Sequence, residues 1–486
     1  MGATLKNSGL VSLGVIAGVV VSMQFSALAQ KPLEPGLPLE QLRQLADVVG
    51  MIESDYVEPV EPAKLLGGAI AGMVASLDPH SAYLDKKAYA ELLDTTQGKF
   101  VGLGIEIAQG DEGFIRILAP IEDSPADRAG ILPGDLITGI DALSIQGLGI
   151  DEAIKKMRGA AHTKVALTIT RAAAPQPLRF VIAREEIVQK SVKGKIVEPG
   201  YGWLRVAQFQ EPTVDDLAAR LLALYQQEPN LKGLVLDLRN DPGGLLQGAI
   251  GVSAAFLPKD AEIVSTRGQL PGSQQIFYGR PEFYALRGEC DALARLPAAL
   301  KNVPLVVLVN TGSASASEIV AGALQDTRRA TIIGSPTFGK GSVQTIRPLS
   351  NDTAVKLTTA RYYTPAGRSI QATGIVPDFL VDENADGDGI NRLRVREADL
   401  AKHLVNERAP APGKAERDGL EDQMRLLAME RGRRPLDYGS ADDFQLRQAL
   451  NHLKGLPLQL SRPLPVPAPA LAHRDGPHGT DAARAR

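Results

Sequence analysis

The spacing of apolar residues changes along the chain and predicts three kinds of folded segment. Between residues 37 and 95 apolar residues recur every three or four positions, as in LEQLRQLADVVGMIESDYV and KLLGGAIAGMVASL, which predicts helices. Residues 97–186 carry short β-type runs (FVGLGIEIA, FIRILAPI, KVALTITR, LRFVIA) around one helical stretch, IDEAIKKMR. From 192 to 380 strand and helix patterns alternate: GLVLDLR then LLQGAIGVSAAF, PLVVLV then SEIVAGALQD, then ATIIG. That alternation predicts an α/β layer with a parallel-rich sheet.

The N-terminal residues are patterned for export. Lys6 precedes an uncharged stretch, LVSLGVIAGVVVSMQF, and then SALAQ, in which Ala27 and Ala29 form the A-x-A pattern that a signal peptidase reads. The uncharged stretch is also long enough to cross a bilayer. Residues 1–29 are therefore expected to be a signal peptide or an N-terminal anchor, and both alternatives place the rest of the chain in the periplasm or cell envelope.

Composition narrows the classes of function. A chain of 486 residues exceeds what one core serves, so two or three modules are expected. The net charge of -3, without a basic stripe, argues against nucleic acid as a partner. The single cysteine, Cys290, excludes an internal disulfide and a cysteine-based metal cluster. The histidines show no metal-binding spacing, so neither a metal nor another cofactor is expected.

Three serines occupy alternate positions in VNTGSASASEIVAGALQD, residues 309–326, between a strand-like and a helix-like run. Ser315 and Glu318 match S-x-x-E, a capping box that marks a helix start. A serine at a strand-to-helix turn also suits acyl transfer, because its hydroxyl is exposed at the sheet edge and the free N–H groups of the helix start can hold an oxyanion. The turn alone leaves both interpretations open.

A serine nucleophile needs a base, and no histidine lies between 163 and 402. A Ser-His pair would therefore need His80, His162 or His403. Lys340, in TIIGSPTFGKGSVQT, is the alternative, because the glycines on both sides allow it to be packed deeply and burial lowers the pKa of a lysine. If the chain continues as a strand, Gln344 shares a face with Lys340 and can hold its amine.

Two other motifs fail as nucleotide sites. Gly334 to Lys340 reads G-x-x-x-x-G-K, but Gly341 stands where a P-loop has Ser or Thr. FVGLGIEI has Ile107 in place of the third glycine of a dinucleotide fingerprint. The glycines of GLVLDLRNDPGGLLQGA belong to a turn, and such a stretch taken alone is more often only a turn. Paired with Ser315 on a neighbouring strand edge, it becomes a candidate whose backbone amides can face a reacting carbonyl.

Several long blocks, in order, resemble the carboxyl-terminal processing (tail-specific) serine peptidases: GLVLDLRNDPGG, SASASEIVAGALQD, FGKGSVQ and VKLTTARYYTPAGRSIQATGIVPD. SLDPHSAYLD resembles the N-terminal signature of that family. The resemblance implies roles that can be listed: Ser315 as nucleophile, Lys340 as general base, Gln344 as the residue orienting it, and the amides of Gly243 or Gly244 and of Ala316 as the oxyanion hole.

Two acidic residues need comment against that resemblance. Asp326 stands where some members of the family place an acidic helper, although a solvated helix end explains it equally well. Asp241 stands where Asn is more usual; in the turn, it is expected to leave the chemistry undisturbed while altering the local charge.

The same resemblance makes residues 97–186 a PDZ domain. Gly102, Leu103, Gly104 and Ile105 stand where such domains have their carboxylate-binding loop, and SPADRAGILPGDLITGIDA is similar to their central segment. Loop amides of this kind capture a terminal carboxylate while the next strand pairs with an extended peptide. The alternative is a β-module that only stabilises the fold.

The resemblance implies an exported serine endopeptidase with a Ser-Lys dyad that cleaves envelope proteins recognised by their C-terminal tails. The expected fold is an α/β peptidase core with a crotonase/ClpP-like layer, an inserted PDZ module and helical N- and C-terminal segments. The expected partners are substrates with apolar C-termini, an adaptor or activator protein, and further copies of the chain in a homo-oligomer. A non-catalytic PDZ receptor and an acyl-CoA enzyme on a related layer are the rival functions. The expected boundaries are 1–29, 37–95, 97–186, 187–380 (peptidase core), 381–460 (C-terminal helical segment) and 461–486 (disordered tail).

Overall fold

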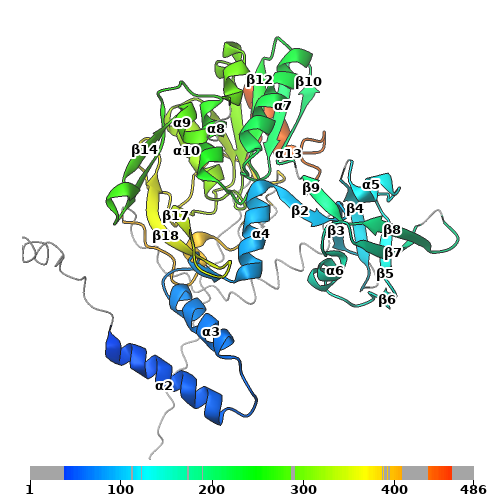
Figure 1. Ribbon diagram of the computed structural model, residues 1–486. Coiled ribbons are helices and arrows are strands. Elements are labelled where there is room, and N and C mark those ends of the chain that lie inside the picture. Colours follow the sequence, from blue (N-terminus) through cyan, green and yellow to red (C-terminus); the bar gives the residue numbers. More distant parts are fainter. Residues whose placement is uncertain are drawn as a thin grey trace, which may run out of the picture. The chain divides into compact units, whose positions relative to one another are not determined.

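Figure 1 shows the computed structural model of the chain. The structure describes residues 38–461 except 111–112, 122, 172–173, 189, 286–289, 386, 388–390, 392–393 and 408–435. The expected signal peptide or anchor and nearly all of the expected tail lie outside the described residues. No helix in the described part is long and apolar enough to span a membrane. The chain divides into two compact units, Met1–Met73 and Val74–Arg486.

The first unit contains two helices where the apolar spacing predicted them. They are α2 (Leu39–Asp55) and α3 (Pro62–Ala75), the second of which runs two residues past the unit boundary. No residue of α2 is buried. Most of its apolar residues, including Leu42, Leu45 and Val48, are exposed, whereas Val49 and Ile52 are half-buried.

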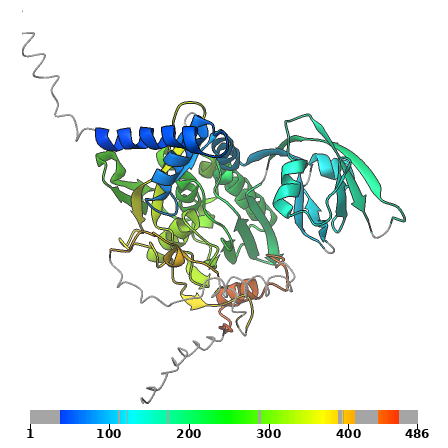
Figure 2. The ribbon, with the colours of Figure 1, turned by 90° about the horizontal axis from the view of Figure 1, so that it is seen from below.

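The β-rich segment in the second unit forms a sheet of its own, drawn in cyan in Figure 2. Its antiparallel order is β3 (Ile105–Gln109), β4 (Ile115–Pro120), β5 (Leu136–Ile140), β7 (Lys164–Thr170) and β8 (Leu178–Ala183), with β6 (Leu143–Ser144) paired to β5. Two helices, α5 (Pro125–Arg128) and α6 (Ile150–Met157), accompany it. Alternate residues of the strands, such as Ile115, Ile117 and Ile169, form a separate core.

The run FVGLGIEIA is two strands rather than one. β2 (Lys99–Gly102) pairs with β9 (Glu185–Val188) in a two-stranded sheet, and β3 starts afresh at Ile105. Gly104 breaks the run: its φ is +76°, and a Cβ there would lie 2.2 Å from Ser124 Cβ. Only glycine fits this close approach.

The central sheet follows the predicted strand-helix alternation. Its order is β10 (Val192–Glu198), β11 (Tyr201–Val206), β12 (Gly233–Asp237), β15 (Leu305–Val309), β16 (Thr331–Gly334) and β19 (Phe379–Leu380). Only the β10–β11 pair is antiparallel. The sheet is therefore parallel-rich, with one antiparallel edge.

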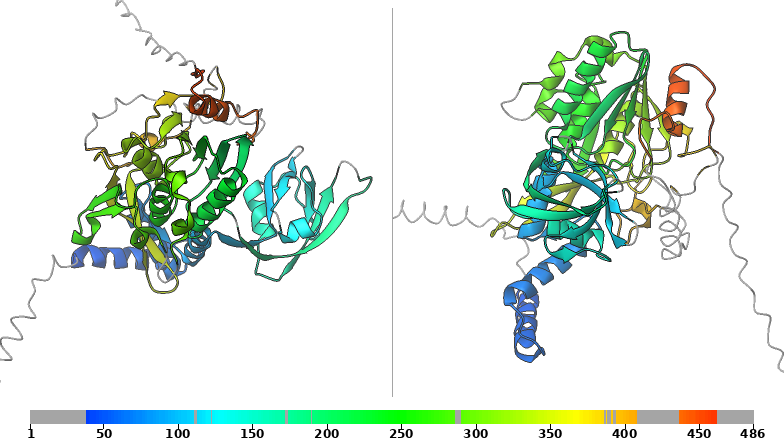
Figure 3. Two further views of the ribbon diagram at one scale, coloured as in Figure 1. Left: turned by 90° about the horizontal axis from the view of Figure 1, so that it is seen from above. Right: turned by 90° about the vertical axis from the view of Figure 1, so that its right-hand side faces the viewer.

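Both faces of the central sheet are covered, because residues alternate between them. Leu234 and Leu236 join the core shared with α7 (Thr213–Gln227), α8 (Leu246–Ala254) and α10 (Ala316–Asp326). Val235 points to the opposite core, where α13 (Phe444–Leu453) packs. Figure 3 shows α13 in orange across the sheet from the green helices.

A second, antiparallel sheet was not predicted. Its order is β1 (Ala82–Leu84), β18 (Ala354–Tyr363), β13 (Glu262–Gly268) and β14 (Gln275–Tyr278), with β17 (Ser342–Pro348) paired to β18. The helix α4 (Lys86–Gln97) follows β1, and the short helix α9 (Pro281–Tyr284) follows β14. The sheets are thus mixed, and the crotonase/ClpP-like layer stays a prediction.

The remaining described elements are short. They are the 3-10 turns η2 (Pro271–Ser273), η3 (Ala292–Arg295), η4 (Ala298–Lys301) and η5 (Glu397–Asp399). Within the described part of residues 381–460, η5 and α13 are the helical elements found.

Candidate active site

Three loops leave the same edge of the central sheet. Asp237 at the end of β12 pairs with Leu308, and Val309 at the end of β15 pairs with Gly334 at the end of β16. The carboxyl ends of parallel strands are where ligands of open α/β sheets bind. The loops that start there carry three predicted groups of site residues: the Gly243–Gly244 pair, Ser315 and Lys340.

Ser315 is the N-cap of α10 and forms a capping box with Glu318. Its φ of 54° and ψ of -109° are strained for a residue with a side chain. Ser315 is partly exposed, whereas Ser313 and Ser317 are fully buried and donate to the backbone carbonyls of Leu238 and Asp241. Of the three alternating serines, only Ser315 is therefore accessible to solvent, and it lies in the strained turn.

Glu318 ties the serine loop to the lysine loop. Its Oε2 accepts from the N–H of Ser315 at 2.8 Å and from the N–H of Lys340 at 2.9 Å. Its Oε1 accepts from the N–H of Gly339 at 2.7 Å and from Thr337 Oγ1 at 2.5 Å. Complete burial raises the pKa of Glu318 to about 7, although these hydrogen bonds work in the opposite direction. Sequence reasoning had assigned Glu318 only the helix cap.

Tyr362 provides a second link between the same two residues. Its hydroxyl lies 3.1 Å from the carbonyl oxygen of Ser315 and also contacts the carbonyl oxygen of Lys340. Burial raises the pKa of Tyr362 well above its usual value, so the hydroxyl keeps its proton for one of these oxygens. The backbones of Ser315 and Lys340 are 25 residues apart in sequence. Both are hydrogen-bonded to the carboxylate of Glu318 and to the hydroxyl of Tyr362.

The surroundings of Lys340 lower the pKa of its amine. Burial is the largest cause that lowers the pKa of Lys340, and the nearby charge of Lys356 adds to it. Three carboxylates oppose the shift: Glu397, Glu318 and Asp78. Burial and Lys356 together outweigh the three carboxylates, so the pKa of Lys340 lies below its usual value. This direction agrees with the expectation from its place between two glycines.

The predicted contact of Gln344 with the Lys340 amine is not among the described hydrogen bonds, and its orienting role stays a prediction. Gln344 donates to Ser342 Oγ at 3.0 Å and to Thr358 Oγ1 at 3.3 Å, and no bond to Lys340 is found among the described residues. β17 starts only at Ser342, and its pairing with β18 is irregular between Val343 and Gln344. The extra residue lies on β18, so Ser342 and Gln344 share a face of β17, as their hydrogen bond shows, while Lys340 precedes the strand.

The glycine turn lies against the serine. A Cβ on Gly243 would lie 2.9 Å from both Ala316 N and Ser315 Cβ, so only glycine allows this approach. The N–H of Gly243 is already engaged, since it donates to Asp241 Oδ1 at 2.9 Å. Gly244 is exposed, and no partner for its N–H or for that of Ala316 is found within the described residues. Of the two predicted glycines, Gly244 has the available amide.

Asp241 is more closely built into this turn than expected. It is fully buried, and its carbonyl accepts from Ala314 N–H at 3.0 Å and from Ser317 Oγ at 2.9 Å. Its Oδ2 has no hydrogen-bond partner in the described part of the chain. Burial raises the pKa of Asp241 to about 8. Asp241 therefore does more than was expected from the sequence, because its carbonyl holds residues on both sides of Ser315.

Asp326 is not a solvated helix end, and its described contacts include neither Ser315 nor Lys340. Its side chain is 6% exposed, pairs with Arg368 and accepts from the N–H of Ala366 at 2.9 Å.

No histidine contacts Ser315 among the described residues. His80 Nε2 lies 2.7 Å from Glu397 Oε2, and His403 Nδ1 lies 2.8 Å from the carbonyl oxygen of Leu400. No group of three or more His, Cys, Asp or Glu side chains in the described ranges is placed to hold a metal ion.

The four residues predicted to bind a substrate tail lie together. Gly102, Leu103, Gly104 and Ile105 line one pocket of about 170 Å³. The other lining residues are Phe100, Val101, Ile107, Ile154, Met157 and Arg158. Apolar side chains beside loop amides suit an extended peptide with an apolar end.

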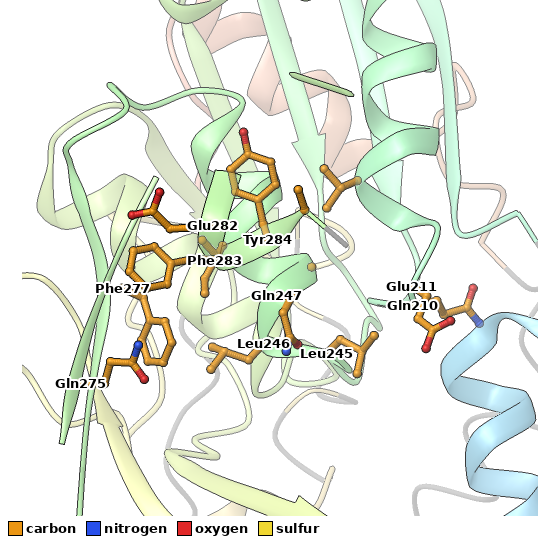
Figure 4. A pocket seen from close by; sticks show the side chains of 14 residues that line it. Gln210, Glu211, Leu245, Leu246, Gln247, Gln275, Phe277, Glu282, Phe283 and Tyr284 are labelled. Atoms are coloured by element: carbon orange, nitrogen blue, oxygen red, sulfur yellow. The ribbon is translucent and has the colours of Figure 1, made fainter. Parts of the chain in front are cut away.

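A larger pocket of about 460 Å³ borders the glycine turn and was not predicted. Figure 4 shows Leu245 and Leu246, which directly follow Gly244, on the same pocket as Phe277 and Phe283. The two phenyl rings meet edge to face at 5.6 Å. This wall comes from β14 and α9, elements that sequence reasoning missed.

Comparison with known proteins assigns the family. The model of peptidase family S41 matches residues 200–381, the model of the activating protease CtpB N-terminal domain matches 19–88, and a PDZ model matches 116–171. A carboxy-terminal-processing protease of Bartonella bacilliformis is 45% identical over 372 residues, covering 76% of this chain and 82% of that protein. A carboxyl-terminal-processing protease of Synechocystis is 38% identical over 340 residues, covering 68% and 75%.

The fold agrees with that assignment. The crystal structure of a Bacteroides fragilis protein assigned to the S41 proteases aligns with a TM-score of 0.50 and 18% identity, over 87% of this chain and 98% of that one. The residues predicted as nucleophile and base lie within the matched peptidase segment. The chain belongs to the carboxy-terminal-processing proteases of peptidase family S41, serine-type peptidases that here carry a PDZ domain.

Proposed function

We propose that the protein is an exported endopeptidase with a Ser315–Lys340 dyad, which cleaves envelope proteins selected by their C-terminal tails. The observation that carries the proposal is the double link between the two residues through Glu318 and Tyr362. A dyad needs its members held at fixed geometry, and no histidine substitutes for Lys340 among the described contacts of Ser315.

The proposed chemistry uses these groups in sequence. Neutral Lys340 takes the Oγ proton of Ser315 while Oγ attacks the substrate carbonyl carbon. The N–H groups of Gly244 and Ala316 hold the resulting oxyanion. As the C–N bond breaks, the Lys340 ammonium returns the proton to the leaving amine. Water then gives a proton to Lys340 and attacks the acyl carbon, and Ser315 recovers its proton when the ester C–O bond breaks.

Substrate choice has two parts in this proposal. The pocket beside the glycine turn takes an apolar side chain near the scissile bond, because Leu245, Leu246, Phe277 and Phe283 line it. The PDZ loop Gly102–Ile105 takes an apolar C-terminus. Export rests on the N-terminal sequence pattern, and the homo-oligomer and the adaptor or activator protein stay predictions.

The test uses the alternation of serines as its control. Ser315→Ala should abolish cleavage of an unfolded, tailed substrate while the protein folds normally, since a lost cap costs only about 1 kcal/mol. Ser313→Ala and Ser317→Ala remove hydroxyls bonded to backbone carbonyls and should keep substantial activity. Cleavage by Ser315→Ala at the wild-type rate would exclude the proposed mechanism.

A further inference from the structure

A chain of hydrogen bonds leads from the N-terminal signature to the loop that carries Lys340. His80 Nε2 lies 2.7 Å from Glu397 Oε2, and Gln371 Nε2 donates to Glu397 Oε1 at 2.8 Å. Gln371 Oε1 in turn accepts from the N–H of Gly341 at 2.9 Å. Glu397 is fully buried, and its N–H also donates to the carbonyl of Phe338 at 3.1 Å. Of these residues, only His80 was considered for catalysis from the sequence, as a base for Ser315.

These hydrogen bonds complete the support of the loop around Lys340, residues 339–341, which is called the lysine loop below. Glu318 holds the N–H groups of Gly339 and Lys340, and the Glu397–Gln371 pair holds the next N–H, that of Gly341. A Cβ on Gly341 would lie 2.7 Å from Gln371 N, so the contact requires glycine. Three successive amides around Lys340 therefore point to acceptors fixed by two buried carboxylates.

The same signature reaches the loop from a second side. Asp78 accepts from the N–H groups of His80 and Ser81, each at 2.9 Å, and from Thr358 Oγ1 at 3.1 Å. Thr358 Oγ1 also accepts from Gln344 Nε2 at 3.3 Å. Among the described residues, the charged groups that act on the pKa of Lys340 are Lys356, Glu397, Glu318 and Asp78.

We propose that Glu397, held by His80 and Gln371, is a positioning residue for Lys340: it fixes the backbone after the lysine and supplies negative charge near its amine. The proposal rests on the proposed function, in which Lys340 is the base. It gives the N-terminal signature a chemical task, because the residue that anchors Glu397 comes from that signature. Burial of Glu397 without His80 would leave a carboxylate oxygen unpaired.

The first experiment is a pH profile of kcat/KM for Glu397→Gln. The charge of Glu397 raises the pKa of Lys340, so its removal lowers that pKa further. The rising limb should move to lower pH, and the ratio of kcat/KM at pH 6.5 to that at pH 9 should increase several-fold. Glu407→Gln, which removes an exposed carboxylate ten residues later, is the matched control and should leave the profile in place. An unchanged midpoint for Glu397→Gln would overturn the proposal, because loss of stability alone does not move it.

His80 gives a second, independent test. His80→Leu should lower kcat about tenfold at unchanged KM, since the lysine loop loses its brace. His80→Gln, which can still donate an N–H to Glu397, should restore most of the rate. Wild-type kcat in a folded His80→Leu variant would contradict the proposal.

A measurement without turnover separates this inference from the proposed function. In a Ser315→Ala background, the rate at which acetic anhydride acetylates Lys340 is followed against pH by peptide mass spectrometry, with and without Glu397→Gln. The midpoint should fall in the double variant. If the wild type cleaves nothing but this midpoint moves, the proposed function fails while Glu397 still sets the state of Lys340. If cleavage depends on Ser315 but the midpoint stays, only the inference fails.

Discussion

A general base must lose its proton near the working pH, and this requirement separates lysine from arginine at position 340. Lys340→Arg should be as inactive as Lys340→Ala, because a guanidinium stays charged. Since burial lowers the pKa of Lys340, the wild-type rate should rise with pH as the amine deprotonates. Steady-state rates from pH 6 to pH 9 test both points; activity in the arginine variant, or a wild-type rate that falls across this range, would point to another base.

Asp241 should make stability depend on pH. Its pKa of about 8 lies above the usual 3.8, so between these values the folded state keeps a proton that the unfolded state has released. This carboxyl therefore favours folding less and less as pH rises from about 4 to about 8. Asp241→Asn removes the effect and should raise the free energy of unfolding by about 1 kcal/mol or more at pH 8.

Urea denaturation at pH 5 and pH 8 tests that prediction. The gain from Asp241→Asn should be larger at pH 8, and the difference between variant and wild type isolates this group from others, such as Glu318, that also titrate. An equal gain at both pH values would mean that Asp241 titrates normally in the folded protein.

The sequence revealed single residues where the signal was local. Ser315 and Glu318 stand three positions apart, so the S-x-x-E pattern predicted their cap, and the structure confirms the capping box. The same spacing could not show that Glu318 also accepts from Thr337, Gly339 and Lys340, because those partners arrive from the next strand-loop unit. Capping and a place in the site are therefore not alternatives in this turn.

At the scale of elements, α9 and β14 form the wall of the pocket beside the glycine turn. Phe283→Ala should lower kcat/KM about tenfold for substrates with a large apolar residue next to the scissile bond, because that substrate side chain loses its contact with the phenyl ring in the pocket. Substrates with a small residue there should lose less. Ile276→Ala, on β14 but outside the pocket and exposed, is the control. Equal losses for large and small residues would exclude the pocket from specificity.

Strands were predicted correctly where they were continuous and buried. The prediction failed where a turn residue ended one strand and started another. PLVVLV became β15, fully buried, as its composition predicted. FVGLGIEIA split because Gly104 turns the chain through a positive φ. The β13, β14 and β18 sheet was missed because its strands are partly exposed and because β13 pairs with β18 across a long stretch of sequence, which periodicity does not record.

At the scale of the whole molecule, Arg239 joins the central sheet to the C-terminal helix. Its buried guanidinium donates to Asp237 and to Asp443, which caps α13. Arg239→Ala leaves both carboxylates buried without their partner and should lower the free energy of unfolding by roughly 3–5 kcal/mol. Lys86→Ala, which breaks an exposed pair with Asp352, should leave the urea midpoint unchanged. Similar midpoints for the two variants would show that the buried network is dispensable.

Under the proposed function, the PDZ domain should select substrates by their C-terminus. Amidating the C-terminus of a long substrate, or replacing its terminal Ala or Val with Asp, should weaken cleavage several-fold, because the loop Gly102–Ile105 offers amides for a carboxylate beside apolar surface. Short peptides should be affected much less. Matched free-acid and amide substrates, with full-length protein and a variant lacking 97–186, provide the test; an unchanged full-length rate after amidation would leave this domain a spacer.

The pairing of His80 with Glu397 spans 317 positions of the chain, and Arg239 reaches Asp443 across 204. Synthesis on the ribosome delivers Ser315 and Lys340 well before either late partner emerges. A nascent chain that already contains both residues of the proposed dyad therefore lacks the carboxylate of Glu397 and the cap of α13. By this order of synthesis, the lysine loop gains the support proposed for it only after Glu397 has been made.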